Sequence, residues 1–171
     1  MSMALLFIIV RFLLVLLSAQ LLRIIPSLAV LFLLIPLVGV GEFSALIALT
    51  FLAVPSILIN TTLGFQEVPV VMKEVASGLG MNHTQLFYKI EIPLAMPYIL
   101  NGLKLALVEI LASATLATYI GAGGLGTLIF TGLGLYRVDL LLIGGATVTL
   151  LSLFSIALFD FIIRKVRKNH V

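Results

Sequence analysis

The sequence contains no cysteine and no tryptophan, and it is poor in charge. Without cysteine the chain has neither a disulfide nor thiolate chemistry, and its composition says nothing about the redox compartment. Charged residues make up 10% of the chain, whereas soluble domains contain roughly a quarter. Hydrophobic residues make up 62% of the 171 positions. This composition excludes an ordinary water-soluble domain.

Motifs of nucleotide and metal chemistry are missing or out of context. No Gly-Lys dipeptide occurs, which excludes a Walker-type phosphate loop and with it ATP hydrolysis by such a loop in this chain. The glycines of 121–126 fit G-x-G-x-x-G but follow an apolar helix rather than a strand, which argues against a dinucleotide site. His83 and His170 have no neighbouring metal ligands, and no Ser/His/Asp set converges. We therefore expect no metal, no cofactor and no enzyme activity.

Long runs without any charge are the main positive feature of the sequence. A helix needs roughly 20 apolar residues to cross the core of a bilayer. Four charge-free runs approach or exceed that length: 24–41, 43–66, 110–136 and 140–159. The pattern predicts an all-α fold, a polytopic transmembrane bundle of about four to five spans. We expect residues 1–171 to form one transmembrane domain.

The first span is ambiguous, and the others are better defined. Residues 3–40 fit either a kinked helix from Arg11 to Pro36 or two short helices broken near Arg23. A turn is expected at 39–42, spans at 43–64, 98–119 and 138–163, and a glycine-rich loop at 121–134. Gly144-Gly145-Ala146 in the last span predicts a close helix contact.

The C-terminal tail sets the expected orientation. Four of the ten basic residues lie in the tail "RKVRKNH" (164–170), a cluster typical of a cytoplasmic flank rather than of a nucleic-acid surface. If the tail is cytoplasmic, the parity of the spans makes 66–97 cytoplasmic and 121–134 extracytoplasmic.

Residues 66–97 form the most polar segment and read as two short amphipathic helices. An apolar stripe recurs at helical spacing in the first: Val68, Val71, Met72, Val75 and Leu79. Gly78 and Gly80 end that helix, and Gly80 is expected to need either a positive φ or a close approach to a partner.

The second short helix begins with a capping pattern. Asn82 and Gln85 have the spacing of a capping box. Pro93 is expected to end this helix, and Pro97 to begin the following span. The two amphipathic helices either pack on the ends of the protein's own spans or dock into the groove of a partner protein.

This segment resembles the "EAA" signature of ABC importer permeases. The family pattern is Glu-Ala-Ala, three residues, Gly, nine residues, then Ile-x-Leu-Pro, and this chain matches its spacing throughout with mild departures at Val75 and Ile92. The resemblance implies coupling helices that sit in a groove of a cytoplasmic ATP-binding subunit. It assigns this coupling role to Glu74, Val75, Ala76, Gly80, Ile90, Ile92 and Pro93.

Two further blocks resemble the osmoprotectant subfamily, whose members import glycine betaine, carnitine and choline. They are "RIIPSLAVLFLLIPLVGVG" (23–41) and "IGAGGLGTLIF" (120–130). The resemblance implies a type I importer permease in a prokaryotic cell membrane. It also implies a second permease subunit, identical or different, and an extracytoplasmic substrate-binding protein. Such permeases usually carry one or two further N-terminal helices.

Two alternatives to an osmoprotectant permease stay open. Arg23 stands where osmoprotectant members have Gln and where methionine permeases can have Arg, so a methionine-type or other small-solute permease is the first. The second is a membrane scaffold that does not transport.

Charges inside the spans are costly, at about 2.5–3.5 kcal/mol each near a helix centre. Arg11, Arg23 and Lys104 are expected near the cytoplasmic ends, where they can snorkel. Asp160 is expected to meet Arg164 four residues on.

Glu109 lies near the middle of the span 98–119 and shares a helix face with Ser113. It either lines a polar path or pairs with a base such as Arg23 to hold helices together. The candidate path residues are Glu109, Ser113 and Asn60.

Overall fold

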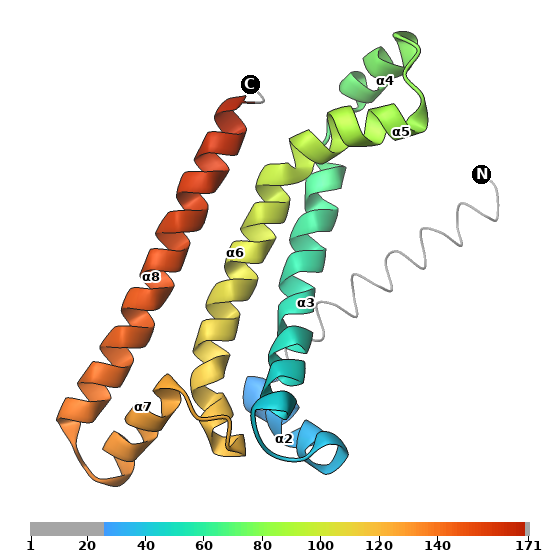
Figure 1. Cartoon of the computed structure of the whole chain (residues 1–171). Coiled ribbons are helices and arrows are strands. Elements are labelled where there is room, and N and C mark those ends of the chain that lie inside the picture. Colours follow the sequence, from blue (N-terminus) through green and yellow to red (C-terminus); the bar gives the residue numbers. More distant parts are fainter. Residues whose placement is uncertain (1–25, 170–171) are drawn as a thin grey trace.

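The structure is a computed structural model that describes residues 26–169, and every regular element in this range is a helix (Figure 1). The α-helices are α2 (Ser27–Val38), α3 (Glu42–Gln66), α4 (Val70–Gly78), α5 (His83–Leu86), α6 (Ile92–Leu116), α7 (Leu125–Gly134) and α8 (Val138–Asn169). A π-helical turn, η1 (Phe87–Glu91), and a 3₁₀ turn, η2 (Ala117–Ile120), flank α6. The all-helical prediction is confirmed.

Within this range three helices are long and apolar enough to cross a membrane: Glu42–Gln66, His83–Ile120 and Val138–Lys168. The predicted spans 43–64 and 138–163 are therefore confirmed. Helices α2 and α7 are apolar but have only 12 and 10 residues, too few for a bilayer. Most of the ambiguous first span falls outside the described residues, so the prediction of four to five spans is not tested.

The predicted break at Pro93 is wrong. The helix from His83 runs 38 residues to Ile120 without interruption, so the second short helix and the span 98–119 are one element. Proline in an α-helix clashes with the carbonyl four residues back and cannot donate. Here the backbone widens just before Pro93, where the N–H of Ile92 donates to the carbonyl of Phe87, five residues back. The wider π-turn accommodates the proline and lets the helix continue.

The predicted loop 121–134 is also largely wrong, because only 121–124 form a turn and the rest is helix α7. The glycines of α7 serve close packing instead of chain reversal. A Cβ at Gly126 would lie 2.1 Å from the Thr115 carbonyl oxygen of α6, and one at Gly132 would lie 2.9 Å from the Leu141 nitrogen of α8. Glycine at these points lets α7 lie directly against both long helices.

Helices α3 and α6 pack most closely, and small residues line their contact. A Cβ at Gly64 would lie 2.7 Å from the Cβ of Tyr98, and one at Gly102 would lie 2.9 Å from the Cβ of Asn60. Ala95 and Ala106 on α6 are buried in the same region. In a membrane, such close backbone approach replaces the hydrophobic effect as the source of association.

At one end of this pair, α2 and η2 close the core. The buried side chains there are Val30, Leu31, Ala45, Ala48, Leu52, Ala117 and Ile120. The turn predicted at 39–42 is confirmed, and the N–H of Gly41 donates to the carbonyl of Ile120 at 2.7 Å. The start of α3 is thereby tied to the end of the long helix.

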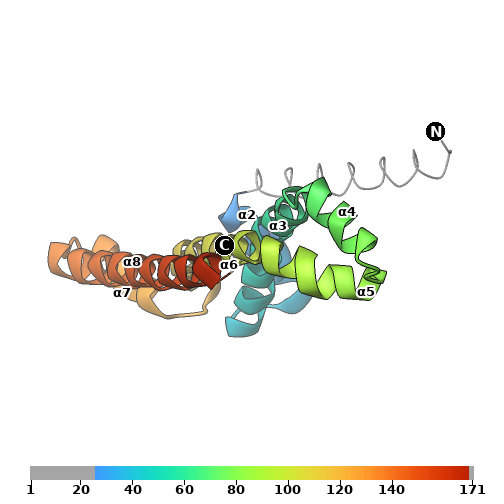
Figure 2. The ribbon, with the colours of Figure 1, turned by 90° about the horizontal axis from the view of Figure 1, so that it is seen from above.

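Helix α8 lies on the other side of α6 and contacts α7 closely. A Cβ at Gly144 would lie 2.7 Å from Cγ1 of Ile129 on α7, which confirms the predicted close contact, whereas Gly145 faces open space. Viewed from above, α7 and α8 lie on one side of the α3–α6 pair, and α4 and α5 on the other (Figure 2). The C-terminal end of α8 lies at the same end of the molecule as α4 and α5 (Figure 1).

The glycine contacts predict a difference between two Gly→Ala variants. Gly102→Ala should lower the stability of the folded chain by about 1–3 kcal/mol, because the added methyl overpacks the α3–α6 contact. Gly145→Ala is the matched control, since nothing lies within 4 Å of the added methyl. Thermal denaturation of the purified chain in one detergent compares the two. Equal melting temperatures for both variants would contradict a tight contact between α3 and α6 at Gly102.

Candidate functional site

The segment 66–97 projects beyond the ends of the long helices as a helical hairpin, α4 followed by α5 (Figures 1 and 2). Helix α5 continues through η1 into α6. The hairpin is therefore joined to a long apolar helix without a flexible link.

Most of the predicted apolar stripe on α4 is exposed. Val68 is buried, with 4% of its surface accessible, but Val71, Met72, Val75 and Leu79 are exposed, from 50% for Met72 to 74% for Leu79. The alternative in which the stripe packs on the protein's own helix ends therefore holds only for Val68. The exposed part of the stripe is called the α4 apolar face below.

The turn between α4 and α5 is fully specified by hydrogen bonds. Gly80 has φ 81°, as predicted, and nothing lies within 4 Å of its missing Cβ. Its N–H donates to the Ser77 carbonyl at 3.0 Å, and the N–H of Met81 donates to the Ala76 carbonyl at 3.1 Å. This pair of bonds is a Schellman motif, which requires a left-handed residue at position 80. Glycine is needed at position 80 because of this backbone conformation, and not because another part of the chain lies close to it.

The predicted capping box is confirmed. The Asn82 side chain accepts from the Gln85 N–H at 2.8 Å, and the Gln85 side chain accepts from the Asn82 N–H at 3.1 Å. The end of α4 and the start of α5 are thus fixed within a few residues of each other.

Two contacts that sequence reasoning missed brace the hairpin. Lys73 of α4 and Glu91 of η1 form an ion pair with an N–O distance of 2.8 Å. The rings of Phe65 on α3 and Phe87 on η1 stack with centroids 5.6 Å apart. Both pairs are distant in sequence, and no local spacing signals them.

The seven predicted coupling residues fall into two groups. Glu74, Val75 and Gly80 are exposed on the hairpin, and Ala76 is buried beneath it. Ile90, Ile92 and Pro93 are half-buried where the hairpin joins α6. The first group therefore lies on the projecting hairpin, and the second at its junction with the long helix.

A connected set of polar side chains joins α3 to α6. The Ser56 hydroxyl donates to Oε2 of Glu109 at 2.7 Å. Nδ2 of Asn60 donates to the Ser56 carbonyl at 2.8 Å, and Nδ2 of Asn101 donates to Oδ1 of Asn60 at 3.1 Å. We call Ser56, Asn60, Asn101 and Glu109 the α3–α6 polar set.

Two of the predicted path residues, Asn60 and Glu109, belong to this set. The third, Ser113, is buried one turn further along α6. Arg23, proposed as the partner of Glu109, lies outside the described residues. The partner that the structure shows for Glu109 is Ser56.

The predicted pairing of Asp160 with Arg164 is wrong. Asp160 of α8 instead accepts from Nζ of Lys104 on α6 at 2.8 Å. Only 18% of the Lys104 side chain is accessible, so this lysine does not simply snorkel to water. A charge held between two membrane helices is costly unless it is paired, which makes the inter-helix pair the more favourable arrangement.

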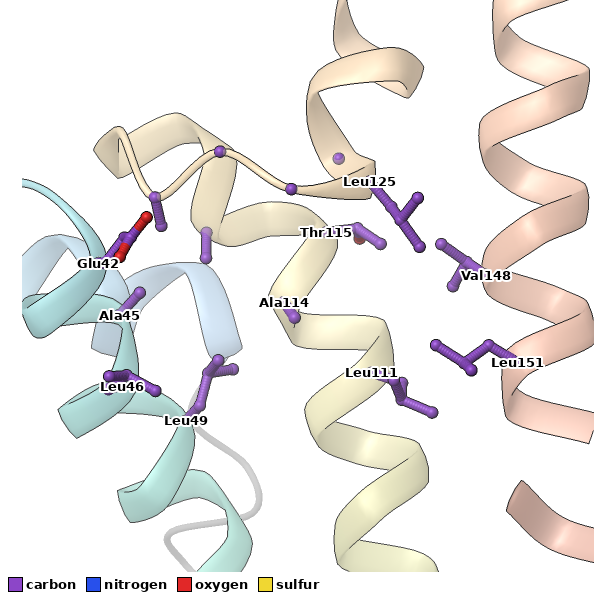
Figure 3. A pocket seen from close by; sticks show the side chains of 15 residues that line it. Glu42, Ala45, Leu46, Leu49, Leu111, Ala114, Thr115, Leu125, Val148 and Leu151 are labelled. Carbon is purple, nitrogen blue, oxygen red and sulfur yellow. The ribbon is translucent and has the colours of Figure 1, made fainter. Parts of the chain in front are cut away.

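An apolar cavity of about 310 Å³ lies at the opposite end from the hairpin (Figure 3). Its walls come from α3, α6, η2, α8, turn residues 122–124 and the start of α7, and among the described residues Glu42 is the one carboxylate that lines it. The sequence did not reveal it because the lining residues are spread over a hundred positions. Among residues 26–169 no group of three or more acidic or His side chains could hold a metal ion.

These features together define a helical membrane protein with a rigid hairpin at one end and polar contacts between its long helices. Residues 2–168 match the family described as "Binding-protein-dependent transport system inner membrane component". The chain belongs to this family. Its members are transport components of the inner membrane.

Several curated relatives carry osmoprotectant names. The chain is 48% identical over 132 residues to the carnitine transport permease protein OpuCB of Listeria monocytogenes, covering 77% of this chain and 61% of that protein. It is 42% identical over 128 residues to the glycine betaine/carnitine/choline transport system permease protein OpuCB of Bacillus subtilis, covering 75% and 59%. The matched region therefore spans about three fifths of these relatives.

A solved structure shares the fold. The inward-facing MetNI methionine ABC transporter superposes with a TM-score of 0.78 over 87% of this chain and 72% of that chain. The sequence identity is 24%, so this likeness concerns the fold alone. It confirms the predicted permease-like architecture.

The polar set predicts a measurable coupling between α3 and α6. In a double-mutant cycle, Ser56→Ala and Glu109→Ala should show an interaction of about 0.5–2 kcal/mol, the range of hydrogen bonds between membrane helices. Ser155→Ala is the control partner, because the Ser155 hydroxyl bonds the carbonyl of Leu151 in its own helix at 2.8 Å. Stability in detergent is measured for all variants. Additivity in the Ser56 cycle would contradict the contact.

Proposed function

We propose that the chain is the membrane-spanning permease subunit of an ATP-driven importer for quaternary-amine osmoprotectants: glycine betaine, carnitine and choline. The names of the relatives that are 42–48% identical support this substrate class. The likeness to the methionine transporter supports only the fold, and Arg23 is the residue that keeps the methionine-type alternative open. We assign ATP hydrolysis to a separate subunit, because the chain has no Gly-Lys dipeptide for a Walker-type loop.

The observation that carries the proposal is the α4 apolar face. It lies on the hairpin that projects beyond the long helices, and its four side chains are at least half exposed. Exposed apolar side chains at helical spacing are typical anchors for a helix that docks in a groove. We assign the groove to the cytoplasmic ATP-binding subunit.

The hairpin is built to transmit force. Because α5, η1 and α6 are continuous, a displacement of α4 moves the beginning of α6 directly. The Lys73–Glu91 pair would pass the same displacement from α4 to η1, and the Phe65–Phe87 stack would pass it from η1 to α3. Closure of two ATP-binding subunits would thereby tilt the long helices between inward- and outward-facing states.

The path is proposed to run along the polar residues of α3 and α6. Glu109, Asn60 and Ser113 are the candidates, and a carboxylate at this depth can offset the desolvation of a passing quaternary ammonium. An extracytoplasmic binding protein would deliver the solute at the end formed by α7 and the turn 121–124. A second permease subunit, identical or different, would complete the path.

The decisive experiment is ATP-dependent uptake. The chain is reconstituted in proteoliposomes with its ATP-binding subunit, its second permease subunit and its binding protein, and labelled choline, betaine and methionine are offered in turn. Uptake of the quaternary amines supports the proposal. Uptake of methionine alone would favour the methionine-type alternative, and assembly without any uptake would favour the scaffold.

The proposed orientation predicts opposite labelling of two engineered cysteines. The natural chain has no cysteine, so Thr84→Cys on the hairpin and Thr127→Cys on α7 each give a single thiol, and both positions are exposed. In intact cells an impermeant maleimide should label only Thr127→Cys, because we place the hairpin and the C-terminus in the cytoplasm. Labelling of Thr84→Cys before the cells are opened would reverse the orientation and remove the coupling role.

The coupling role predicts that two neighbouring glycines differ. Gly80→Ala should sharply reduce co-purification of the ATP-binding subunit, because the left-handed conformation costs an L-residue about 1–2 kcal/mol and the turn must rearrange. Gly78→Ala is the control, since its Cβ meets nothing within 4 Å and no positive φ is required. Both variants should insert normally in the membrane. Equal co-purification with the two variants would argue against docking through this turn.

A further inference from the structure

A second cavity lies between α6 and α8 at the end of the molecule that carries the hairpin. Helices α6 and α8 come closer together toward this end (Figure 1), and the cavity between them measures about 400 Å³. Its walls are Pro93, Leu94, Pro97, Tyr98, Asn101 and Lys104 of α6 and Asp160, Ile163 and Arg167 of α8. None of these residues is a path candidate, although Asn101 contacts one candidate, Asn60.

The cavity is lined by one base from each helix. Lys104 pairs with Asp160, which leaves Arg167 in excess and gives the lining one net positive charge. Asp160 and Arg167 lie seven residues apart on the same face of α8, so their Cα atoms are about 10 Å apart along the helix axis. Lys104 has two further N–H donors beyond the one directed at Asp160.

The remaining walls suit an anion with an apolar body. The Tyr98 hydroxyl and the second amide hydrogen of Asn101 are donors, because Asn101 uses one hydrogen on Asn60. Proline, leucine and isoleucine side chains complete the surface. Arginine and lysine together with neutral donors recognise phosphate oxygens, and arginine can do so with two parallel bonds.

We propose that this cavity binds the phosphate of an anionic phospholipid and so joins α6 to α8. The basic end of α8, with Arg164, Lys165, Arg167 and Lys168, marks the headgroup layer of the leaflet at this end. Basic pockets between membrane helices at that level are typical sites for anionic headgroups. A lipid suits the cavity better than free phosphate, because its acyl chains can cover the apolar wall residues next to the charged ones.

If the hairpin has the coupling role proposed above, a lipid bound in this cavity would affect how the hairpin moves the long helices. Lys104 and Tyr98 lie on the same continuous helix as Phe87 and Glu91, which brace the hairpin. A phosphate held between Lys104 and Arg167 would fix the angle between α6 and α8 close to the point where α4 delivers its displacement. The lipid would thus tune how far that displacement moves α8.

The test measures lipid binding to the purified full chain, without an ATP-binding subunit or solute. Binding of phosphatidylglycerol is followed by native mass spectrometry and by the shift in melting temperature, with phosphatidylcholine and inorganic phosphate as separate arms. Arg167→Gln should weaken phosphatidylglycerol binding roughly tenfold, as expected for loss of a charge-assisted contact. Lys165→Gln is the matched control, because it removes the same charge from the same turn but does not line the cavity.

A neutralised pair, Lys104→Gln with Asp160→Asn, tests the α6 side without leaving a buried charge unpaired. It should also weaken phosphatidylglycerol binding, and Arg167→Gln decides the matter if the double variant does not fold. Equal weakening by Arg167→Gln and Lys165→Gln would reduce the effect to a general attraction of the basic tail. An equal shift in melting temperature with inorganic phosphate would show that the cavity binds free phosphate rather than a lipid. Loss of lipid binding when the chain self-associates would show that a second copy of the chain covers the cavity. Because no transport is measured, these outcomes are independent of the proposed import function.

Discussion

Helices α3 and α6 approach each other closely because glycine stands at two points of their contact. At Gly64 and Gly102 even one methyl group would meet the neighbouring helix at 2.7–2.9 Å. This approach brings the Ser56 hydroxyl within 2.7 Å of the Glu109 carboxylate and Asn60 within 3.1 Å of Asn101. In lipid an unpaired polar group is costly, so the polar residues are tolerated where they are only because the two backbones lie so near.

The other elements are positioned from this pair. At one end, the hydrogen bond from Gly41 to Ile120 and the buried cluster around Leu31 fix α2 and the beginning of α3. At the other end, the stack of Phe65 on Phe87 holds the hairpin against the end of α3. The hairpin can therefore be rigid although it makes few contacts of its own. A loss of the α3–α6 contact would release both ends.

Local signals in the sequence predicted much of the local structure, and most of the failures concern contacts between helices. The capping box at Asn82 and the positive φ of Gly80 depend on a few neighbouring residues, and both were predictable. Pro93 was misjudged because its effect depends on a π-turn that precedes it, and α7 was misjudged because its glycines serve packing across helices. The partners of Lys104 and Glu109 lie more than fifty residues away, and a single sequence has no spacing rule for such pairs. Most of the predicted first span lies outside the residues that the structure describes.

The exposed apolar surfaces of α8 and α4 need different partners, because α8 is long enough to cross a bilayer and α4 is not. Only 11% of the most apolar window of α8 is buried within the chain, but that helix is long enough to cross the bilayer, so lipid tails or another membrane helix can cover it. The α4 apolar face belongs to a nine-residue helix that begins after Glu67 and Pro69. The sequence of this helix also contains the charged residues Lys73 and Glu74. The helix is too short to cross the bilayer and lies in the most polar part of the chain. Water is its alternative environment, and the hydrophobic effect there favours a protein groove.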